Sequence, residues 1–288
     1  MLQSFTDWVD DIGTSYRNLR ILKTCKTHVN HVILAESHTL GKILIINNEV
    51  QHVEKWKFLY HEPLVHLPMS FIKNPSNAII IGGGSLNALR ELNKYKSLKE
   101  IEIVEIDYNV IRMMTEIDRC QAALISDSRV NIKEADGYAY LARSSKTYDL
   151  IINDALDITK LPRKTRIVQT MQEHLTNEGV CVDVVYRHIF EKKALRRMFY
   201  HLSDVKNVVF SLIYVPDYPG ILHLLTMWAR NPQLSQTLRR PINVEQKQWI
   251  KHKSIPCEYF DPSNLSFFLH IPQYMRKIIK EEFRRIDP

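Results

Sequence analysis

Carboxylates follow short apolar runs at several points of the chain, and each is placed to do chemistry. Asp154 comes directly after the apolar run at residues 150–153, and Asp157 stands three residues further on. A carboxylate in such a place can hold an amine by a charge-assisted hydrogen bond and take up its proton when the nitrogen attacks carbon. We therefore take Asp154 as the candidate catalytic residue. Asp157 is either its partner or a helix cap or turn residue.

Three consecutive glycines lie between an apolar run and an amphipathic run. Residues 79–89 are IIIGGGSLNAL, in which Gly82, Gly83 and Gly84 precede Ser85. Glycine lets the backbone turn sharply and lets a ligand approach without a Cβ in the way. The N–H groups at the start of the following helix favour polar or negative ligand groups. The segment predicts a ligand-binding loop, although a plain glycine-rich turn would have the same letters.

The next carboxylates favour a nucleoside as the ligand. Glu105 ends the alternating run at residues 100–107, about 20 residues past the glycines, where a carboxylate can accept hydrogen bonds from both ribose hydroxyls. Asn87 or Ala88 occupies the third glycine position of a GxGxxG motif, which disfavours NAD. Asp136 and Gly137 follow the third apolar run. Asp136 could accept from an adenine amino group while Gly137 admits the ring, or it could cap the helix that follows.

The elements that position these residues alternate between strands and helices. Apolar runs predict strands, and the segments between them predict helices, over the following residues: strands 78–81, 100–106, 130–134, 150–153 and 180–185; helices 85–95, 108–117, 139–144 and 166–175. Such alternation predicts a mostly parallel sheet covered on both faces, with its ligand at the carboxyl ends of the strands. Residues 208–215 and 223–229 predict a closing antiparallel pair around a turn at 218–220.

The N-terminal part has a different pattern. Residues 31–36, 42–47 and 49–53 predict a small antiparallel sheet, and residues 57–66 predict a helix that ends near Pro68. The fold class we expect is α/β, a Rossmann-like, SAM-type doubly wound sheet with a small N-terminal antiparallel β domain. We expect residues 1–68 to form that β domain with its linking helix. Residues 69–288 would form the catalytic domain, including a tail that ends in a basic helix from about Gln273.

Taken together, the motifs resemble the spermidine synthase family, also called polyamine aminopropyltransferases. The similarity covers nearly the whole chain, and its pieces stand in the family's order: ESHTLGKILIINNEVQHVEKWKFLYHEPLVH, IIIGGGSLNALRE, VEID, ADGYAY, DALD, VPDYPG and YFDPSNLSFFLHIP. The resemblance implies transfer of an aminopropyl group from decarboxylated SAM to an amine, with methylthioadenosine released. It also implies a homodimer or homotetramer.

The resemblance also implies a role for each matching residue. Gln51 would contact the donor nucleoside, and Gly82, Gly83, Gly84 and Ser85 would form the donor loop. Glu105 would bind the ribose hydroxyls, and Asp136 with Gly137 the adenine. Asp154 would position and deprotonate the attacking amine. Four residues would line the acceptor channel: Tyr60, His61, Asp157 and Tyr218.

Two departures from the family pattern bear on the substrates. Ser85 replaces the loop aspartate that holds the donor's terminal amine, so the donor could be intact SAM, giving up a 3-amino-3-carboxypropyl or a methyl group. A basic stretch with Lys160, Arg163 and Lys164 follows Asp157. It would repel a polyamine and attract an anionic acceptor, for example a peptidyl-nucleotide antibiotic of the microcin C type. The acceptor we expect is therefore a small molecule or a modified peptide.

Two other functions compete with aminopropyl-type transfer. A SAM-dependent methyltransferase could use the same nucleoside site and would release S-adenosylhomocysteine instead of methylthioadenosine. A non-catalytic nucleoside-binding relative is favoured by the loss of the loop aspartate. The retention of Asp154 and Asp157 argues against it.

The composition excludes several other classes. The 288 residues are 45% hydrophobic and 25% charged, as in ordinary globular proteins, and contain no apolar run of about 18 residues that could span a membrane. The four cysteines have no zinc-ligand or disulfide spacing, and the N-terminus has no secretory pattern, so we expect a cytoplasmic protein. The net charge of +7 comes with no nucleic-acid-binding motif, and we expect no nucleic-acid or membrane partner. Histidine pairs without neighbouring carboxylates or thiolates predict no metal.

Overall fold

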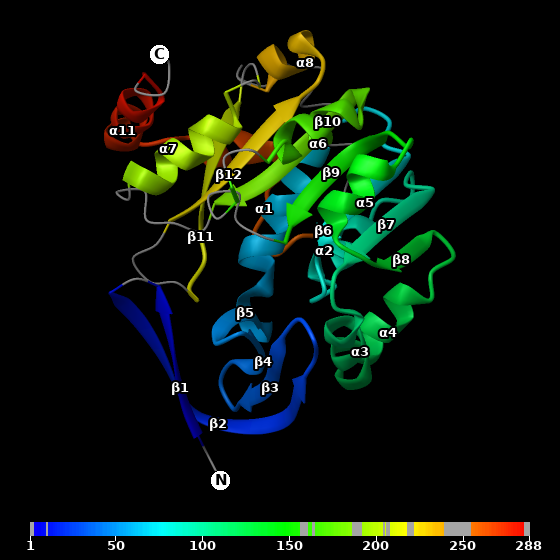
Figure 1. Cartoon of the computed structure of the whole chain (residues 1–288), viewed down its shortest axis with the longest axis vertical. Helices are drawn as coiled ribbons and strands as arrows, with labels where there is room; N and C mark the ends of the chain where they lie inside the picture. The colour runs from blue at the N-terminus through cyan, green and yellow to red at the C-terminus, as the bar shows by residue number, and fades with distance from the viewer. Residues whose placement is uncertain are drawn as a thin grey trace.

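The structure is a computed structural model with two β-sheets joined by a long helix (Figure 1). It describes residues 3–9, 11–155, 161–162, 165–185, 192–203, 205, 208–217, 222–238 and 255–284. Asp157, Tyr218 and the cationic residues Lys160, Arg163 and Lys164 therefore lie outside the described residues.

The N-terminal sheet has five antiparallel strands in chain order. They are β1 (Gln3–Val9), β2 (Ile12–Lys26), β3 (His31–Ser37), β4 (Gly41–Ile46) and β5 (Glu49–Val53). The Asp7 carboxylate on β1 accepts a hydrogen bond from the Val50 N–H on β5 at 2.9 Å, so the sheet curls until its two edge strands meet. The predicted antiparallel sheet is confirmed, but its first two strands, β1 and β2, were not predicted from the sequence. Along β2 only Tyr16 and Leu19 are buried, which is too few to give a strand-like alternation.

The larger sheet has the strand order β11-β12-β10-β9-β6-β7-β8. Its strands are β6 (Asn77–Gly82), β7 (Glu100–Glu105), β8 (Val130–Glu134), β9 (Tyr148–Asp154), β10 (Leu175–Val185), β11 (Val209–Tyr214) and β12 (Leu222–Ala229). Neighbours from β8 through β10 pair in parallel, whereas β12 runs antiparallel between β10 and β11. The chain winds outward from β6 in both directions, so β6 and β9 flank the switch point at which open α/β sheets bind ligands. The predicted doubly wound sheet and its closing antiparallel pair are confirmed.

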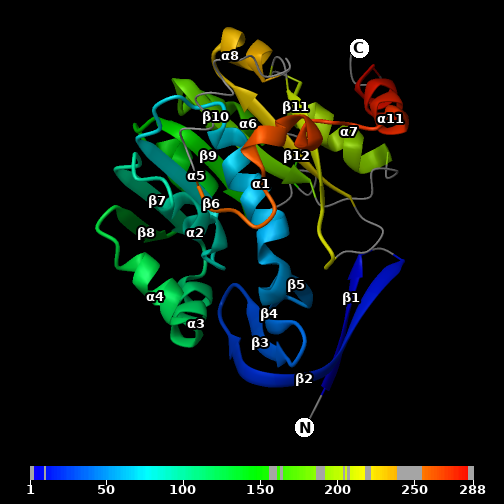
Figure 2. The ribbon, with the colours of Figure 1, turned by 180° about the vertical axis from the view of Figure 1, so that it is seen from behind.

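Helices cover both faces of the larger sheet, because alternate residues of its central strands point to opposite sides. Ala78 and Ile80 of β6 pack with α1 (Lys57–Met69) and α2 (Asn87–Asn93). Ile79 and Ile81 pack against the opposite set of helices, seen on the near side in Figure 1 and from behind in Figure 2: α5 (Gly137–Arg143), α6 (Ile167–Glu173), α7 (Lys192–His201) and α11 (Gln273–Arg284).

Two helices connect the sheets. Helix α3 (Tyr108–Ile117), followed by α4 (Arg119–Ile125), packs Val110 and Met113 against Leu34 and Leu44 of the small sheet. Helix α1 follows the short 3-10 turn η1 (Glu54–Trp56) and is buried from His61 through Met69 (Figure 2). It runs past Pro68 to Met69, slightly beyond the predicted end.

The C-terminal part lies against α1. Glu62 of α1 accepts hydrogen bonds from the backbone N–H groups of Glu258, Tyr259 and Phe260, each at 2.8 Å. The remaining short elements are α8 (Pro232–Thr237), η3 (Pro262–Asn264) and α10 (Leu265–Phe268). Helix α11 confirms the predicted basic C-terminal helix.

Candidate active site

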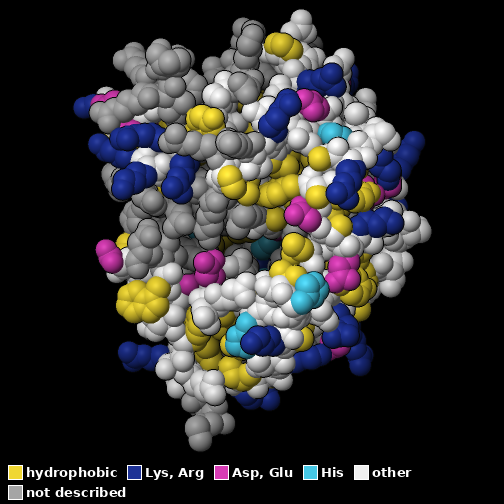
Figure 3. Space-filling view, viewed as in Figure 1, with side chains coloured by type: hydrophobic (Ala, Val, Ile, Leu, Met, Phe, Trp, Pro, Cys, Tyr) yellow, Lys and Arg dark blue, Asp and Glu magenta, His cyan; other side chains and the backbone are white. Residues whose placement is uncertain are grey.

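A cavity of about 610 Å³ opens at the carboxyl edge of the larger sheet, where the small sheet faces it. In the space-filling view, a hollow is visible near the middle of the molecule (Figure 3). Every predicted site residue that the structure describes lines this one cavity: Gln51, Tyr60, His61, Gly82, Gly83, Gly84, Ser85, Glu105, Asp136, Gly137 and Asp154. The structure thus brings together residues that are up to 103 positions apart in the sequence, from Gln51 to Asp154.

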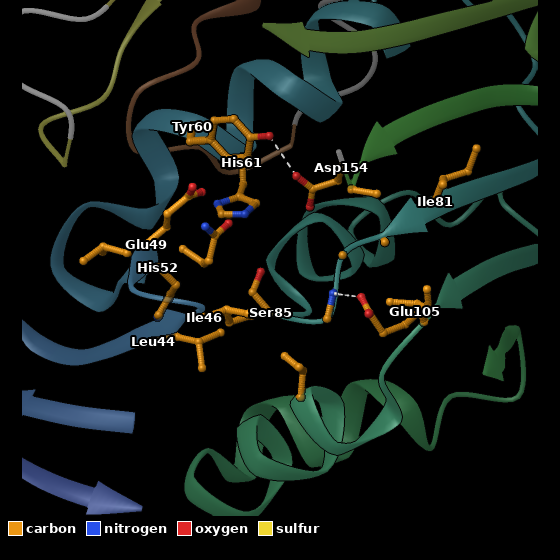
Figure 4. A pocket seen from close by; sticks show the side chains of 18 of the residues that line it. Leu44, Ile46, Glu49, His52, Tyr60, His61, Ile81, Ser85, Glu105 and Asp154 are labelled. Carbon is orange, nitrogen blue, oxygen red and sulfur yellow. Dashed lines mark hydrogen bonds between the residues drawn. The ribbon is translucent and has the colours of Figure 1, made fainter. Parts of the chain in front are cut away.

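Asp154 ends β9 at the switch point, beside Gly82 of β6. The hydroxyl of Tyr60 donates a hydrogen bond to Asp154 Oδ1 at 2.8 Å (Figure 4). Burial raises the pKa of Asp154 to about 7, against the opposing effect of the Tyr60 hydrogen bond, and the nearby Glu105 charge raises it further. A carboxyl group with this pKa changes protonation state near neutral pH, as a group that takes up a substrate proton must.

The glycine loop needs its glycines for conformation and for space. Gly82 and Gly83 have φ angles of 81° and 79°, in the left-handed region that side chains disfavour. A Cβ on Gly82 would lie 2.6 Å from the Asp154 carbonyl oxygen, and one on Gly83 would lie 2.7 Å from Ile80 Cγ2. The loop therefore lies directly against the strand end that carries Asp154.

Glu105 and Asp107 have different surroundings at the end of β7. Glu105 lines the cavity, and its carboxylate accepts from the Gly84 N–H and the Asp107 N–H, each at 3.0 Å. Burial raises the pKa of Glu105. Asp107 is fully buried and accepts from Thr27 Oγ1 at 2.7 Å and Asn30 Nδ2 at 2.9 Å. Only Glu105 is thus available to a ligand, while Asp107 holds the small sheet.

Asp136 caps a helix and also lines the cavity, so the two roles that the sequence left open do not exclude each other. Its Oδ1 caps α5 by accepting from the N–H groups of Tyr138 at 2.9 Å and Ala139 at 3.0 Å. The same side chain is exposed and lines the cavity. A Cβ on Gly137 would lie 2.5 Å from Ile81 Cγ2, so this glycine allows α5 to approach the sheet closely.

The small sheet and α1 supply the opposite wall. Gln51 stands on β5. Tyr60 and His61 stand on α1 (Figure 4). His61 Nδ1 is 2.6 Å from the Lys57 carbonyl oxygen. Burial lowers the pKa of His61 to about 4, so its imidazole is neutral at physiological pH.

Ser85 sits in a neutral hydrogen-bond chain at the loop position where the family pattern has aspartate. The Asn87 side-chain amide donates to Ser85 Oγ at 3.1 Å and to His52 Nδ1 at 2.9 Å. Burial lowers the pKa of His52 well below its usual value, and the charge of Lys57 lowers it further. No member of this chain of three side chains carries a charge at neutral pH.

Asp217 is a cavity residue that the sequence analysis did not select. It follows β11 and accepts hydrogen bonds at Oδ1 from Trp56 Nε1 at 2.6 Å and the Tyr16 hydroxyl at 3.3 Å. Burial raises its pKa to about 6. The available signal was an acid just after the predicted strand at residues 208–215, because that strand ends at the same sheet edge as the strand before Asp154.

The described residues contain neither a metal-binding cluster nor a membrane-spanning helix. No three His, Cys, Asp or Glu side chains there are grouped so that they could hold a metal ion. No helix in that part of the chain has the length and apolar character needed to cross a membrane.

Comparisons with known proteins give the family. A family model described as "Spermine/spermidine synthase domain" matches residues 57–237. The polyamine aminopropyltransferase of Moorella thermoacetica is 27% identical over 281 residues, covering 95% of this chain and 96% of the relative. Putrescine N-methyltransferase 2 of Nicotiana attenuata is 28% identical over 289 residues, covering 91% of this chain and 72% of the relative.

The fold has solved counterparts. A spermidine synthase crystallised with the transition-state analogue AdoDATO superimposes with a TM-score of 0.83 and 20% identity, over 97% of this chain and 95% of that one. The predicted resemblance and fold class are thereby confirmed. With the family match covering more than half of its length, this chain belongs to the spermine/spermidine synthase family, as a divergent member.

Proposed function

We propose that this protein transfers an aminopropyl-type group from a sulfonium nucleoside to an amine, with Asp154 as the catalytic carboxylate. The amine nitrogen attacks the donor carbon next to sulfur, the C–S bond breaks, and sulfur keeps the electron pair. The products are methylthioadenosine and the alkylated amine, and the nitrogen's proton passes to Asp154. The observation that carries the proposal is the partly buried Asp154 carboxyl with its pKa near 7, in one cavity with the glycine loop and Glu105.

The donor half of the cavity would lie over β6 and β7. Glu105 would accept from the ribose hydroxyls, and Asp136 with Gly137 would lie beside the adenine, with Gln51 opposite them on β5. Decarboxylated SAM is the donor that the named relatives favour. The neutral chain through Ser85, Asn87 and His52 lacks a carboxylate for a cationic donor terminus, which keeps intact SAM as the second donor to test.

The charge of the cavity favours a cationic acceptor. Its described lining contains one lysine, Lys57, and five carboxylates: Glu49, Glu105, Asp136, Asp154 and Asp217. Such a wall attracts amines and repels phosphates. The anionic acceptor considered from the sequence depends on Lys160, Arg163 and Lys164, which are outside the described residues. We therefore propose a small-molecule amine as the acceptor.

Methyl transfer is the second candidate, because a putrescine N-methyltransferase is among the relatives. The same Asp154 could deprotonate an amine that attacks the donor's methyl carbon instead. The C–S bond that breaks would then be the one to methyl, and S-adenosylhomocysteine would be released.

Identification of the nucleoside product decides between these functions. The purified protein would be incubated with putrescine and either decarboxylated SAM or SAM, and the nucleosides separated by chromatography. Methylthioadenosine supports the proposal, and the donor that yields it is the true donor. S-adenosylhomocysteine would establish the methyltransferase. Absence of both products with a series of amines would refute catalysis, and the Asp154→Asn variant provides the background rate.

A further inference from the structure

A second concave surface lies at the opposite edge of the larger sheet from the candidate active site. It is a groove of about 580 Å³ formed by the segments at residues 73–76 and 94–99, with Ile255 beside them. These segments lead directly into β6 and β7, whose first residues, Asn77 and Glu100, are parallel partners. Because β6 has six residues at about 3.3 Å each, the groove lies roughly 15–20 Å from the glycine loop at the other end of that strand. A ligand bound in the groove would therefore not touch the residues proposed for the chemistry.

The side chains of this groove carry positive charge only. Four lysines line it, Lys73, Lys94, Lys96 and Lys99, whereas no Asp or Glu of the described residues does. Lys94 forms an ion pair of 2.5 Å with Glu91, which lies outside the groove. In the part of the chain that the structure describes, no carboxylate comes within ion-pair distance of Lys96 or Lys99. Like charges gathered around one groove repel one another, so this surface is suited to an anion that carries several charges.

The loop between α2 and β7, which carries three of these lysines, is held in shape by Arg129. The guanidinium group donates hydrogen bonds to the carbonyl oxygens of Tyr95 at 3.0 Å and Leu98 at 3.3 Å, and it also contacts the Asn93 side chain. Arg129 is itself oriented by Asp127, whose Oδ2 accepts from Nη2 at 2.8 Å. Because these contacts fix the backbone of the loop, the groove is formed before a ligand arrives, which lowers the entropic cost of binding.

The other walls of the groove are tied to this loop by hydrogen bonds. The Lys99 N–H donates to the Ser76 carbonyl oxygen at 2.7 Å, which joins the two segments that lead into the sheet. Lys94 Nζ donates to the Pro256 carbonyl oxygen at 2.9 Å, which places Ile255 at the side of the groove. Three separate segments of the chain thus build one concave surface.

The lining offers donors to phosphate groups and no stacking surface to a nucleobase. Besides the lysines, it contains the neutral donors Asn74, Ser76 and Ser97. Tyr95 is the one aromatic residue among the described residues of the lining, and it is only 6% exposed. Proteins that bind single-stranded nucleic acids stack successive bases on open aromatic rings, and this groove presents none. Its chemistry therefore favours phosphates over bases.

We propose that this groove is a binding site for a short chain of phosphates, either free or carried by a nucleotide. The phosphate oxygens would accept hydrogen bonds from the ammonium groups of Lys73, Lys96 and Lys99, which are all exposed. Lysine suits such a ligand because its ammonium group is a compact charge with three donors. The site is separate from the cavity of the proposed transfer reaction, and its occupation does not depend on that reaction.

Calorimetry with sodium tripolyphosphate tests the proposal on the intact protein. We expect saturable binding to the wild type and an affinity about tenfold lower, or weaker still, in the double variant Lys96→Gln, Lys99→Gln, because two charged donors are lost. Both side chains are exposed, so this variant should fold. The double variant Lys96→Arg, Lys99→Arg keeps both charges and should bind within a few-fold of the wild type. Tripolyphosphate should also raise the Tm of the wild type and not that of the Gln variant.

A matched control separates this groove from general attraction by a basic protein. The double variant Lys277→Gln, Lys280→Gln removes the same number of charges from exposed lysines of α11. It should bind tripolyphosphate as the wild type does. Equal losses of affinity in the two Gln variants would show that net charge alone attracts the ligand and would overturn the proposal. Absence of saturable binding to the wild type would overturn it as well.

ATP and AMP distinguish the two sources of the phosphates. Equal affinities for ATP and tripolyphosphate identify the phosphate chain as the whole determinant. Tighter binding of ATP, lost in the Gln variant of Lys96 and Lys99, identifies a nucleotide as the ligand. AMP should bind about tenfold more weakly than ATP, or weaker still, since it carries one phosphate, and equal affinities for AMP and ATP would overturn the proposal.

A single-stranded oligonucleotide supplies the last comparison. If it bound more tightly than tripolyphosphate and lost that affinity in the Gln variant of Lys96 and Lys99, the groove would be a nucleic-acid site and the proposal would be wrong. Weaker binding than tripolyphosphate supports the proposal. None of these measurements uses the transfer reaction, so a failure here leaves the proposed function intact, and a failure of the proposed function leaves this test unchanged.

Discussion

The hydroxyl of Tyr60 on α1 donates a hydrogen bond to Oδ1 of Asp154 at the end of β9, across 2.8 Å. This contact joins the helix that leaves the small sheet to the switch point of the larger one. It stabilises the ionised carboxylate and so lowers the pKa of Asp154. Burial has the opposite and larger effect and raises this pKa to about 7. An element outside the larger sheet therefore lowers the proton affinity of the proposed base.

Removal of that hydroxyl should move the acid limb of the pH profile. In Tyr60→Phe the pKa of Asp154 rises further above its usual value, since a hydrogen bond to the charged form is lost. We expect the fall of kcat/KM at low pH to begin about one pH unit higher than in the wild type, with a several-fold loss at pH 7. Measurement of kcat/KM between pH 6 and 9 checks this.

The control for this prediction is Tyr140→Phe. Tyr140 also donates to a carboxylate, Glu102, at 2.7 Å, but neither residue lines the cavity. The pH profile of kcat/KM for Tyr140→Phe should match that of the wild type. A Tyr60→Phe profile that coincides with the wild-type profile would show that Asp154 is not the titrating base.

Neutralising Asp154 should abolish turnover and increase stability at alkaline pH. A carboxyl with a raised folded-state pKa favours folding below the unfolded pKa, and this contribution is lost as the pH rises through about 7. The Asp154→Asn variant has no carboxyl group to ionise, so it avoids this loss of stability. Its side-chain oxygen can still accept the hydrogen bond from Tyr60. We expect its free energy of unfolding to exceed that of the wild type by on the order of 1–2 kcal/mol at pH 8, after allowance for the opening of the site to the cavity.

Urea unfolding of both proteins at pH 5 and pH 8 measures this difference. The gain should be smaller at pH 5, where the wild-type carboxyl is largely protonated. Donor affinity, measured by calorimetry, should stay within a few-fold of the wild-type value. A variant that is less stable than the wild type at pH 8 would contradict the pKa assigned to Asp154.

The sequence predicted the larger sheet well because its signals are local and strong. Runs such as residues 78–81 and 150–153 are apolar on both faces, as strands of a covered parallel sheet must be. Ligands bind at the carboxyl ends of such strands, which predicts that Glu105, Asp136 and Asp154 lie together at one edge of the sheet. These residues do line one cavity, although their individual roles stay predictions.

What could not be predicted depends on contacts between distant segments. Asp217 gains its place from Trp56 and Tyr16, which are 161 and 201 positions away. The long strand β2 has too few buried residues to show a pattern, because much of it is exposed. Asp136 caps α5 and still lines the cavity, so its predicted roles as helix cap and as ligand contact do not exclude each other. The sequence alone could not show this, because it does not tell which way the side chain points.

Alanine substitutions in the glycine loop should differ in severity. A Cβ on Gly82 would lie 2.6 Å from the Asp154 carbonyl oxygen and 2.8 Å from Ala155 Cα, both backbone atoms that cannot move aside cheaply. Its positive φ adds strain. A Cβ on Gly84 would lie 2.9 Å from Glu105 Oε2 and from Val110 Cγ1, which are side-chain atoms that can shift.

We therefore expect Gly82→Ala to lower the free energy of unfolding by about 2 kcal/mol or more and to abolish turnover. Gly84→Ala should be destabilised much less, but donor affinity should fall at least tenfold because the Glu105 carboxylate is displaced. Thermal unfolding and nucleoside calorimetry separate the two effects. Normal donor affinity in Gly84→Ala would remove Glu105 from the donor site.

The anchoring of α1 by Glu62 should control the geometry of Tyr60. Glu62 is 1% exposed and accepts from three backbone N–H groups, of Glu258, Tyr259 and Phe260. In Glu62→Gln one carboxylate oxygen becomes an amide NH₂ group that faces at least one of these donors, so a buried N–H loses its acceptor. The expected cost is about 1–3 kcal/mol of stability.

Because Tyr60 lies two residues before Glu62 on the same helix, the substitution should also lower kcat more than it changes donor affinity. The acid limb of the pH profile should move in the direction expected for Tyr60→Phe, which a general loss of stability would not produce. The control is Glu258→Gln, since the exposed Glu258 contributes only its backbone N–H to Glu62. If Glu62→Gln lost stability but kept the wild-type kcat and pH profile, the C-terminal segment would support α1 without positioning Tyr60 against Asp154.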